Sequence, residues 1–318
     1  MTVWWRKAKL RKNKPPLFVT STSIQRLQWS ELRQQEQNSL SLILFILSPR
    51  GKQLRELVFV GLGLNDEKGI SLQGIEETRT ADSVFMELYT SLMPDFSLER
   101  FEKLSGKKVN AVSRRNLEEE NGQTILNAAL KGKTVFLVPG DPFVATTHIT
   151  LRLEAEKRGV KTRVVHGASI ISAIIGFSGL HNYKFGKTVT VPFPENASET
   201  PYNVIAQNKN LGLHTLCLLD LKVDEGRFLS VKEGLKQLLE IEQKRNEKIV
   251  TPSTVAVGVA RVGSVNPTLK ADEAEKLLNY DFGGPPQSLI VPGELHFMET
   301  EALIAFAGAP VKLRGLNR

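Results

Sequence analysis

The 318-residue sequence contains a single cysteine, Cys217. One thiol cannot form a disulfide within the chain, so the disulfide-rich secreted folds are excluded and the count suits a reducing cytosol. The thiol lies in the apolar run Leu216-Cys217-Leu218-Leu219, with no neighbour in sequence that would activate it. We therefore expect Cys217 to be a buried small hydrophobic residue and not a nucleophile.

Motifs of metal sites, NTPases and serine hydrolases are also missing. None of the five histidines stands at metal-ligand spacing to another, and one cysteine cannot complete a zinc site. The chain has neither a GxxxxGK[ST] phosphate loop nor a G-x-S-x-G elbow. We therefore predict no metal, and hydrolase and NTPase functions lack their basic parts. The histidines are His148, His166, His181, His214 and His296.

Long hydrophobic runs are absent as well. The longest extends from Leu40 to Leu47 and is interrupted by Ser41, whereas a membrane-spanning helix needs about 20 apolar residues. The run also lies deep in the chain, with no small-residue cleavage site behind it, which is atypical of a signal peptide. We predict no membrane association and a cytoplasmic location.

The net charge of +8 is confined to the beginning of the chain. Residues 1–54 hold ten Lys/Arg and two acidic residues, which leaves 42 − 10 = 32 basic and 34 − 2 = 32 acidic residues in the remainder. All three tryptophans also fall in this segment, at Trp4, Trp5 and Trp29. Because the remainder of the chain is neutral, we predict no nucleic-acid partner.

Two interpretations of residues 1–54 remain open. The segment can be a disordered basic arm that contacts an acidic partner, or an upstream stretch that the choice of start codon added, without a structural role. No methionine lies between Met1 and Met86, so only an alternative start codon could begin the chain near Leu57. We favour the second interpretation and predict a division into 1–54, 55–167 and 168–318.

From Leu57 onward, short apolar runs alternate with stretches of helical pattern. This alternation predicts an α/β fold whose sheet is largely parallel and covered by helices on both faces. The predicted strands are 57–60, 84–86, 135–138, 162–166, 216–221, 254–260 and 288–291. One predicted helix begins after Ser71, a suitable N-cap, and another begins at Ser169. The other predicted helices span residues 145–158, 201–210, 231–247 and 271–279.

Two glycine-containing loops follow predicted strands. Gly61-Leu62-Gly63-Leu64 does not match the dinucleotide-binding fingerprint, because Asp66 stands where a third small residue is required. Pro139-Gly140-Asp141-Pro142 ends a strand at the carboxyl edge of the sheet, where ligands of open α/β sheets bind. Asp141 can line such a pocket, or it can simply be the N-cap of the next helix. Thr146-Thr147-His148 can face either the pocket or solvent.

These segments are part of a longer, ordered set that resembles the diphthine synthases, within the tetrapyrrole-methylase-like superfamily. The resemblance covers residues 57–318 and does not include the first 54. GLGL and GDP occur across the superfamily, whereas YTS, ATTH and YKFGK together point to the diphthine synthase branch. The matching segments are FVGLGL (59–64), ELYTSLM (87–93), PGDPFVATTH (139–148), HGASIISA (166–173), GLHNYKFGK (179–187), GLHTLCLLDLK (212–222), ARVGSVNPT (260–268), DFGGPP (281–286) and VPGELH (291–296).

The resemblance implies two α/β domains, each a mixed sheet flanked by helices, with S-adenosylmethionine (SAM) between them. It also implies a homodimer. At Gln287 many relatives carry His, and Gln can likewise donate and accept a hydrogen bond. The positions that correspond to SAM contacts of the family are Leu64, Asp141, Val144, Ser169, Ile170, Leu219, Val262 and Gln287.

The resemblance implies translation elongation factor 2 as the substrate. The modified residue is a histidine that already bears an aminocarboxypropyl group, and methylation of the amino group of that arm forms diphthine. The direct passage from Asp220-Leu221-Lys222 toward helix 231–247 is typical of the archaeal type. No residue is identifiable as a base, and Tyr89, Thr90 and His148 are candidates for orienting the substrate. Two alternatives remain: a precorrin or uroporphyrin methylase of the same fold, and a non-catalytic protein that binds an acidic partner through residues 1–54.

Overall fold

The computed structural model describes residues 54–317. The prediction made for residues 1–54 lies outside that range, apart from Leu54. In the described range no helix is long and apolar enough to cross a membrane, and no three His, Cys, Asp or Glu side chains gather as they would around a metal ion.

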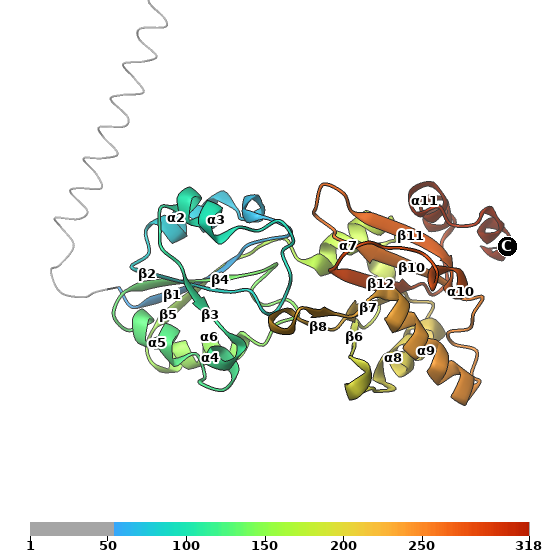
Figure 1. The fold of residues 1–318 in the computed structure, drawn as a ribbon, viewed down its shortest axis with the longest axis horizontal. Helices are drawn as coiled ribbons and strands as arrows, with labels where there is room; N and C mark the ends of the chain where they lie inside the picture. The colour runs from blue at the N-terminus through green and yellow to red at the C-terminus, as the bar shows by residue number, and fades with distance from the viewer. Residues whose placement is uncertain (1–53, 318) are drawn as a thin grey trace, which may run out of the picture. The chain divides into compact units, whose positions relative to one another are not determined.

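A five-stranded sheet, parallel throughout, forms the first half (Figure 1). Its strand order is β3-β2-β4-β1-β5, and every residue of the interior strand β1 is buried. A strand buried on both faces needs apolar residues at successive positions, which explains the run ELVFVG. The strands are β1 (Glu56–Gly61), β2 (Ser83–Glu87), β3 (Asn110–Val112), β4 (Lys133–Val138) and β5 (Lys161–Val165).

Helices cover both faces of this sheet, with α2 and α3 on one side and α4, α5 and α6 on the other (Figure 1). Alternate residues of β1 enter different cores: Phe59 packs with Leu126 and Leu151, and Val60 packs with Ile75 and Phe101. Serine N-caps begin three of the helices, at Ser71, Ser97 and Ser113. The helices are α2 (Leu72–Arg79), α3 (Leu98–Ser105), α4 (Arg114–Glu118), α5 (Gln123–Ala129) and α6 (Ile149–Lys157).

The second half contains another five-stranded sheet, of order β11-β10-β12-β7-β6. Only β6 and β7 run parallel; the other pairs are antiparallel. The largely parallel sheet expected from the alternation of strands and helices is therefore confirmed in the first half, and the second half contains a mixed sheet, as the family resemblance implies. The strands are β6 (Val189–Val191), β7 (Thr215–Leu219), β10 (Val255–Ala260), β11 (Thr268–Glu273) and β12 (Gln287–Val291), and β8 (Leu221–Lys222) and β9 (Arg227–Phe228) form a small hairpin.

Cys217 lies on β7 and is fully buried, as predicted, and burial raises the pKa of its thiol to about 12.

The helices of this half are α7 (Ile170–Ser178), α8 (Thr200–Asn210), α9 (Val231–Arg245), α10 (Ala274–Leu277) and α11 (Phe297–Ala307). Of these, α10 is a single turn. Short 3-10 turns are η1 (Glu67–Gly69), η2 (Asn182–Lys184), η3 (Pro194–Asn196), η4 (Val223–Glu225) and η5 (Val311–Asn317).

Two predicted helices were wrong in their bounds. The helix expected at 145–158 begins only at Ile149, because Ala145 adopts a left-handed φ of 57° that no α-helix contains. The helix expected at 271–279 is reduced to α10, since residues 271–273 belong to the edge strand β11. That strand reads TLKADE, and its polar side chains hid it from a search for apolar runs.

Candidate functional site

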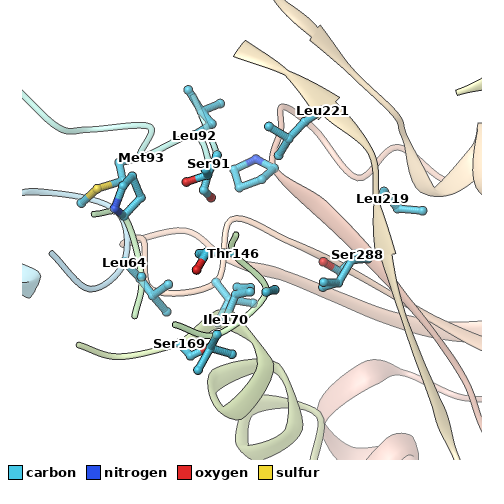
Figure 2. A pocket seen from close by; sticks show the side chains of 18 of the residues that line it. Leu64, Ser91, Leu92, Met93, Thr146, Ser169, Ile170, Leu219, Leu221 and Ser288 are labelled. Atoms are coloured by element: carbon cyan, nitrogen blue, oxygen red, sulfur yellow. The ribbon is translucent and has the colours of Figure 1, made fainter. Parts of the chain in front are cut away.

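A cavity of about 520 Å³ is lined by residues from both sheets. From the first sheet come the loops that follow β1, β2 and β4; from the second half come the start of α7, the ends of β7 and β10, and the start of β12. Since β12 runs antiparallel to its neighbours, its first residues lie at the same edge as the ends of the other two strands. Figure 2 shows Leu64 and Thr146 on one side of the cavity and Leu219 and Ser288 on the other.

The loops after β1 and β4 are joined by backbone hydrogen bonds between Gly63 and Gly140, in both directions, at 3.2 and 2.8 Å. Gly61 lies against two other loops: a Cβ there would lie 2.5 Å from the carbonyl oxygen of Gly140 and from the nitrogen of Gly167. The glycines therefore allow three backbone segments to meet at the base of the cavity. This close approach explains the first glycine of the GLGL segment better than simple strand termination does.

Asp141 has a structural task that its position in sequence did not reveal. Its carboxylate accepts a hydrogen bond from the backbone N–H of Phe143 at 3.0 Å and lies 2.7 Å from Nδ1 of His166. The N-cap of α6 is His148, seven residues further on. The alternative in which Asp141 caps that helix is therefore wrong. The carboxylate instead connects the loop after β4 to the segment after β5, at the cavity wall.

A buried carboxylate, Glu87, holds the loop that follows β2. It accepts hydrogen bonds from the backbone N–H groups of Tyr89 and Thr90, at 2.9 and 3.0 Å, and from the Thr90 hydroxyl. Burial raises the pKa of Glu87 to about 6, although these hydrogen bonds act in the opposite direction. Tyr89 and Thr90 both line the cavity, whereas Glu87 stands behind them. The hydroxyl oxygen of Tyr89 is buried without a hydrogen-bond partner.

His148 does not line the cavity. Its ring is 2% exposed, and burial lowers its pKa to about 4. Nδ1 lies 3.2 Å from the carbonyl oxygen of Pro142, and Nε2 is buried without a hydrogen-bond partner. The ring packs edge-on against Phe136 at 5.2 Å between centroids. The structure therefore corrects the prediction that His148 orients the substrate: it is a neutral core residue that supports the wall from behind.

The second half supplies a mixed wall. Ser169 caps α7 by accepting a hydrogen bond from the backbone N–H of Ile171 at 3.2 Å, and the first turn of α7 borders the cavity. Leu219 and Val262 add apolar surface. The amide of Gln287 is already engaged, since its oxygen accepts from the N–H of Val231 and its nitrogen donates to Gly283.

The residues expected at one site do come together. All eight positions that the resemblance assigned to SAM line the cavity, together with Tyr89 and Thr90. The analysis of the sequence missed Glu87, although it follows a predicted strand at the same carboxyl edge as the PGDP loop. It also missed the charged residues of the lining other than Asp141, for which no motif gave a signal. They are Arg114, Glu118, Asp220 and Arg261.

Comparison with known proteins assigns the family. Residues 56–264 match the family model of the tetrapyrrole (corrin/porphyrin) methylases. The diphthine synthase of Methanosarcina mazei is 48% identical over 264 residues, which cover 81% of this chain and 98% of that protein. The diphthine synthase of Methanocaldococcus jannaschii is 45% identical over 251 residues, covering 78% of this chain and 97% of that protein. The chain belongs to the diphthine synthase family.

Solved structures agree with this diphthine synthase assignment. A crystal structure of diphthine synthase superposes with a TM-score of 0.74 at 44% identity, covering 82% of this chain and 99% of that one. A putative diphthine synthase from Entamoeba histolytica gives a TM-score of 0.73 at 35% identity, covering 80% of this chain and 99% of that one. As a member of this family, the chain is a SAM-dependent methyltransferase of diphthamide biosynthesis, and its two helix-flanked α/β sheets have the fold of the tetrapyrrole methylases.

Proposed function

We propose that this enzyme methylates the amino group of the aminocarboxypropyl-modified histidine of translation elongation factor 2, forming diphthine, with SAM bound in the cavity. One observation carries the proposal. The eight positions that correspond to the family's SAM contacts are spread from Leu64 to Gln287 in sequence, yet all of them line a single cavity.

The residues present fit SAM. The cavity volume of about 520 Å³ lies within the range of roughly 300–1,000 Å³ typical of small-molecule sites. Leu64, Leu219 and Val262 offer apolar surface to an adenine ring. The first turn of α7 presents backbone N–H groups that favour a carboxylate, such as that of the cofactor. When bound, SAM supplies an electrophilic methyl group on a sulfonium, which is a good leaving group.

The chain's own residues then have to position the amine and keep it neutral. Positioning means holding the nitrogen about 3–3.5 Å from the methyl carbon, in line with the bond that breaks. A protonated amine has no free electron pair, so a partly dry wall that disfavours the charged form assists the reaction. Tyr89 and Thr90 line the cavity on a loop that Glu87 fixes by three hydrogen bonds, and we assign them to this orienting role.

A homodimer and a cytoplasmic location are part of the proposal. The first is supported by three large apolar side chains that are exposed on η2 and α11, which we together call the α11 apolar surface: Tyr183, Phe297 and Phe306. Large apolar side chains left exposed in this number can be covered by a partner subunit. The second follows from the proposed substrate, since a translation factor is a cytoplasmic protein.

Charge in the cavity disfavours a tetrapyrrole as the substrate. The charged lining residues comprise two arginines and three acidic residues, a sum of 2 − 3 = −1. One of the arginines, Arg261, is also engaged, because it donates to the carbonyl oxygens of Phe282 and Gly284. A macrocycle that carries several carboxylates would require an excess of cations. The proposal in which residues 1–54 form a binding arm concerns residues outside the described range.

The decisive experiment is transfer of labelled methyl from SAM to purified elongation factor 2 that carries the aminocarboxypropyl histidine. We expect the label on the amine of the modified histidine, located by mass spectrometry, and no label on unmodified factor. A precorrin or uroporphyrin substrate serves as the comparison. Labelling of the tetrapyrrole, with the modified factor left unlabelled, would overturn the proposal.

A further inference from the structure

Among the charged residues of the cavity lining, Arg114 and Glu118 stand apart. The described residues provide neither of them with a hydrogen-bond or ion-pair partner, and both are exposed. The other three are engaged: Asp141 with His166, Asp220 with the backbone N–H of Leu221, and Arg261 with backbone carbonyls. The Arg114 guanidinium lies over the ring of Tyr89, 5.3 Å from its centroid.

Arg114 and Glu118 both belong to α4, four residues apart, so their side chains share one face of the helix. They do not pair with each other. The adjacent residues Arg115 and Glu119 have the same spacing, form an ion pair at 3.5 Å and do not line the cavity. The helix therefore carries two Arg/Glu pairs of the same spacing. Arg115 and Glu119 form an ion pair away from the cavity, whereas Arg114 and Glu118 line the cavity and do not pair.

Two unpaired charges of opposite sign, one helical turn apart, match a ligand group that itself carries both signs at short separation. An α-amino acid head is such a group, because its carboxylate and its ammonium are bonded to the same carbon. Arginine presents a planar fork of donors that suits a carboxylate, and a carboxylate accepts hydrogen bonds from the N–H groups of an amine. Tyr89, whose ring lies under the guanidinium, belongs to the same wall, and its hydroxyl is buried without a hydrogen-bond partner.

We propose that Arg114 binds the carboxylate of an α-amino acid head on the substrate and that Glu118 accepts a hydrogen bond from the amino group of the same head. The inference rests on the proposed function, since an aminocarboxypropyl arm ends in this head. SAM carries the same chemistry in its methionine part, so the source has to be decided. The eight positions assigned to SAM lie after β1, β4 and β10, at the end of β7, on β12 and at the start of α7; none follows β3 as α4 does. This separation assigns the head to the substrate.

The test compares Arg114→Met and Glu118→Gln with the matched controls Arg115→Met and Glu119→Gln. Methyl transfer is measured at saturating SAM while the concentration of modified elongation factor 2 is varied, and the affinity for S-adenosylhomocysteine is measured by calorimetry. We expect Arg114→Met to raise KM for the factor about 10–100-fold and Glu118→Gln to raise it about 3–10-fold, typical of lost charge-assisted hydrogen bonds. Affinity for S-adenosylhomocysteine should change less than about twofold, and the control variants should behave as wild type.

A second measurement addresses the head group itself. 2-Aminobutyrate, a short α-amino acid, should compete with the factor in the wild type and in Arg115→Met, but not in Arg114→Met, whereas butyrate should compete less well. Arg114→Lys keeps the charge without the fork and should recover part of the lost KM. A thermal melt of each variant confirms that it is folded.

The outcomes separate the two proposals. If Arg114→Met and Glu118→Gln match their controls, this inference is wrong and the proposed function stands. If Arg114→Met weakens S-adenosylhomocysteine with KM for the factor unchanged, the head belongs to the cofactor and the assignment to substrate is wrong. If the wild type leaves the modified factor unmethylated, the proposed function fails, and this inference fails with it.

Discussion

Glu87 and His148 face each other behind the cavity wall, with Oε1 and Nε2 3.9 Å apart and both side chains almost completely buried. Burial raises the pKa of Glu87 to about 6 and lowers that of His148 to about 4. Both shifts favour the uncharged forms, so burial opposes an ion pair between the two groups.

The pKa shifts of Glu87 and His148 predict how the free energy of unfolding depends on pH. The pKa of Glu87 rises on folding, from 4.5 to about 6, so the folded state binds the extra proton and the free energy of unfolding increases as pH falls through this window. The pKa of His148 falls from 6.5 to about 4, which has the opposite effect between those values. The two contributions therefore nearly cancel between pH 6 and 4.5.

Glu87→Gln removes the contribution of Glu87 and leaves that of His148. Over the window from pH 6 to 4.5, its free energy of unfolding should fall by about 2 kcal/mol relative to that of the wild type, at about 1.4 kcal/mol per pH unit. Urea denaturation at several pH values measures the difference. Glu242→Gln is a suitable control, because Glu242 is also buried and accepts backbone hydrogen bonds, but its pKa is lowered by them despite its burial. A difference that does not change with pH would contradict the assignment.

Asp141→Ala should weaken the binding of S-adenosylhomocysteine about tenfold or more, because the carboxylate shapes the cavity wall and ties it to His166. Calorimetry of binding and a melting curve are measured together. Asp66→Ala is the matched control: Asp66 accepts from the backbone N–H two residues on at 3.0 Å, as Asp141 does, but does not line the cavity. Equal losses of stability with unchanged affinity in both variants would show that Asp141 only stabilises its turn.

Gly61→Ala should destabilise the protein by about 1–3 kcal/mol and weaken cofactor binding, since the added methyl group would meet backbone atoms of two loops at 2.5 Å. Gly176→Ala offers the contrast. Gly176 lies within α7, is exposed, and a Cβ there meets nothing within 4 Å. That variant should gain about 0.5–1 kcal/mol. Thermal or chemical denaturation of both variants tests the argument, and a neutral Gly61→Ala would refute it.

The α11 apolar surface should form the dimer contact. Phe306→Glu places a charge on it and should shift the protein from dimer to monomer, as measured by light scattering during size-exclusion chromatography. Leu72→Glu is the control, because Leu72 is similarly exposed but lies on α2, in the first half of the chain. A wild-type protein that is monomeric at micromolar concentration, or a Phe306→Glu dimer as stable as that of the wild type, would argue against this surface.

A chain that starts at Leu54 should fold and retain methyl transfer, because both five-stranded sheets and the whole cavity lining lie within residues 54–317. Its tryptophan fluorescence should disappear, since every tryptophan precedes residue 30. Melting temperature and activity are compared with those of the full chain. Loss of activity would favour the interpretation in which residues 1–54 form a binding arm, and a sharply lower melting temperature would show that they stabilise the fold.

The sequence by itself determined the strands with continuous apolar runs, such as β1, β4 and β10, and the helices that begin at Ser71 and Ser169. These signals are local, since they depend on burial of neighbouring residues and on caps. Motifs were equally informative about the family, because GLGL, PGDP and YKFGK are read directly from the chain. For the same reason the eight positions assigned to SAM could be named before their common cavity was seen.

Only the tertiary structure decided which side chains share a surface. The burial of His148, the engagement of Asp141 with His166 and the isolation of Arg114 from Glu118 all depend on contacts between loops far apart in sequence. No local pattern separates Arg114 from Arg115, since the two are adjacent and of the same type. The turn of α4 directs one toward the cavity and the other to Glu119. Adjacent residues of a helix differ in direction by 100°. This rotation, together with the position of α4 beside the cavity, gives Arg114 and Arg115 their different surroundings.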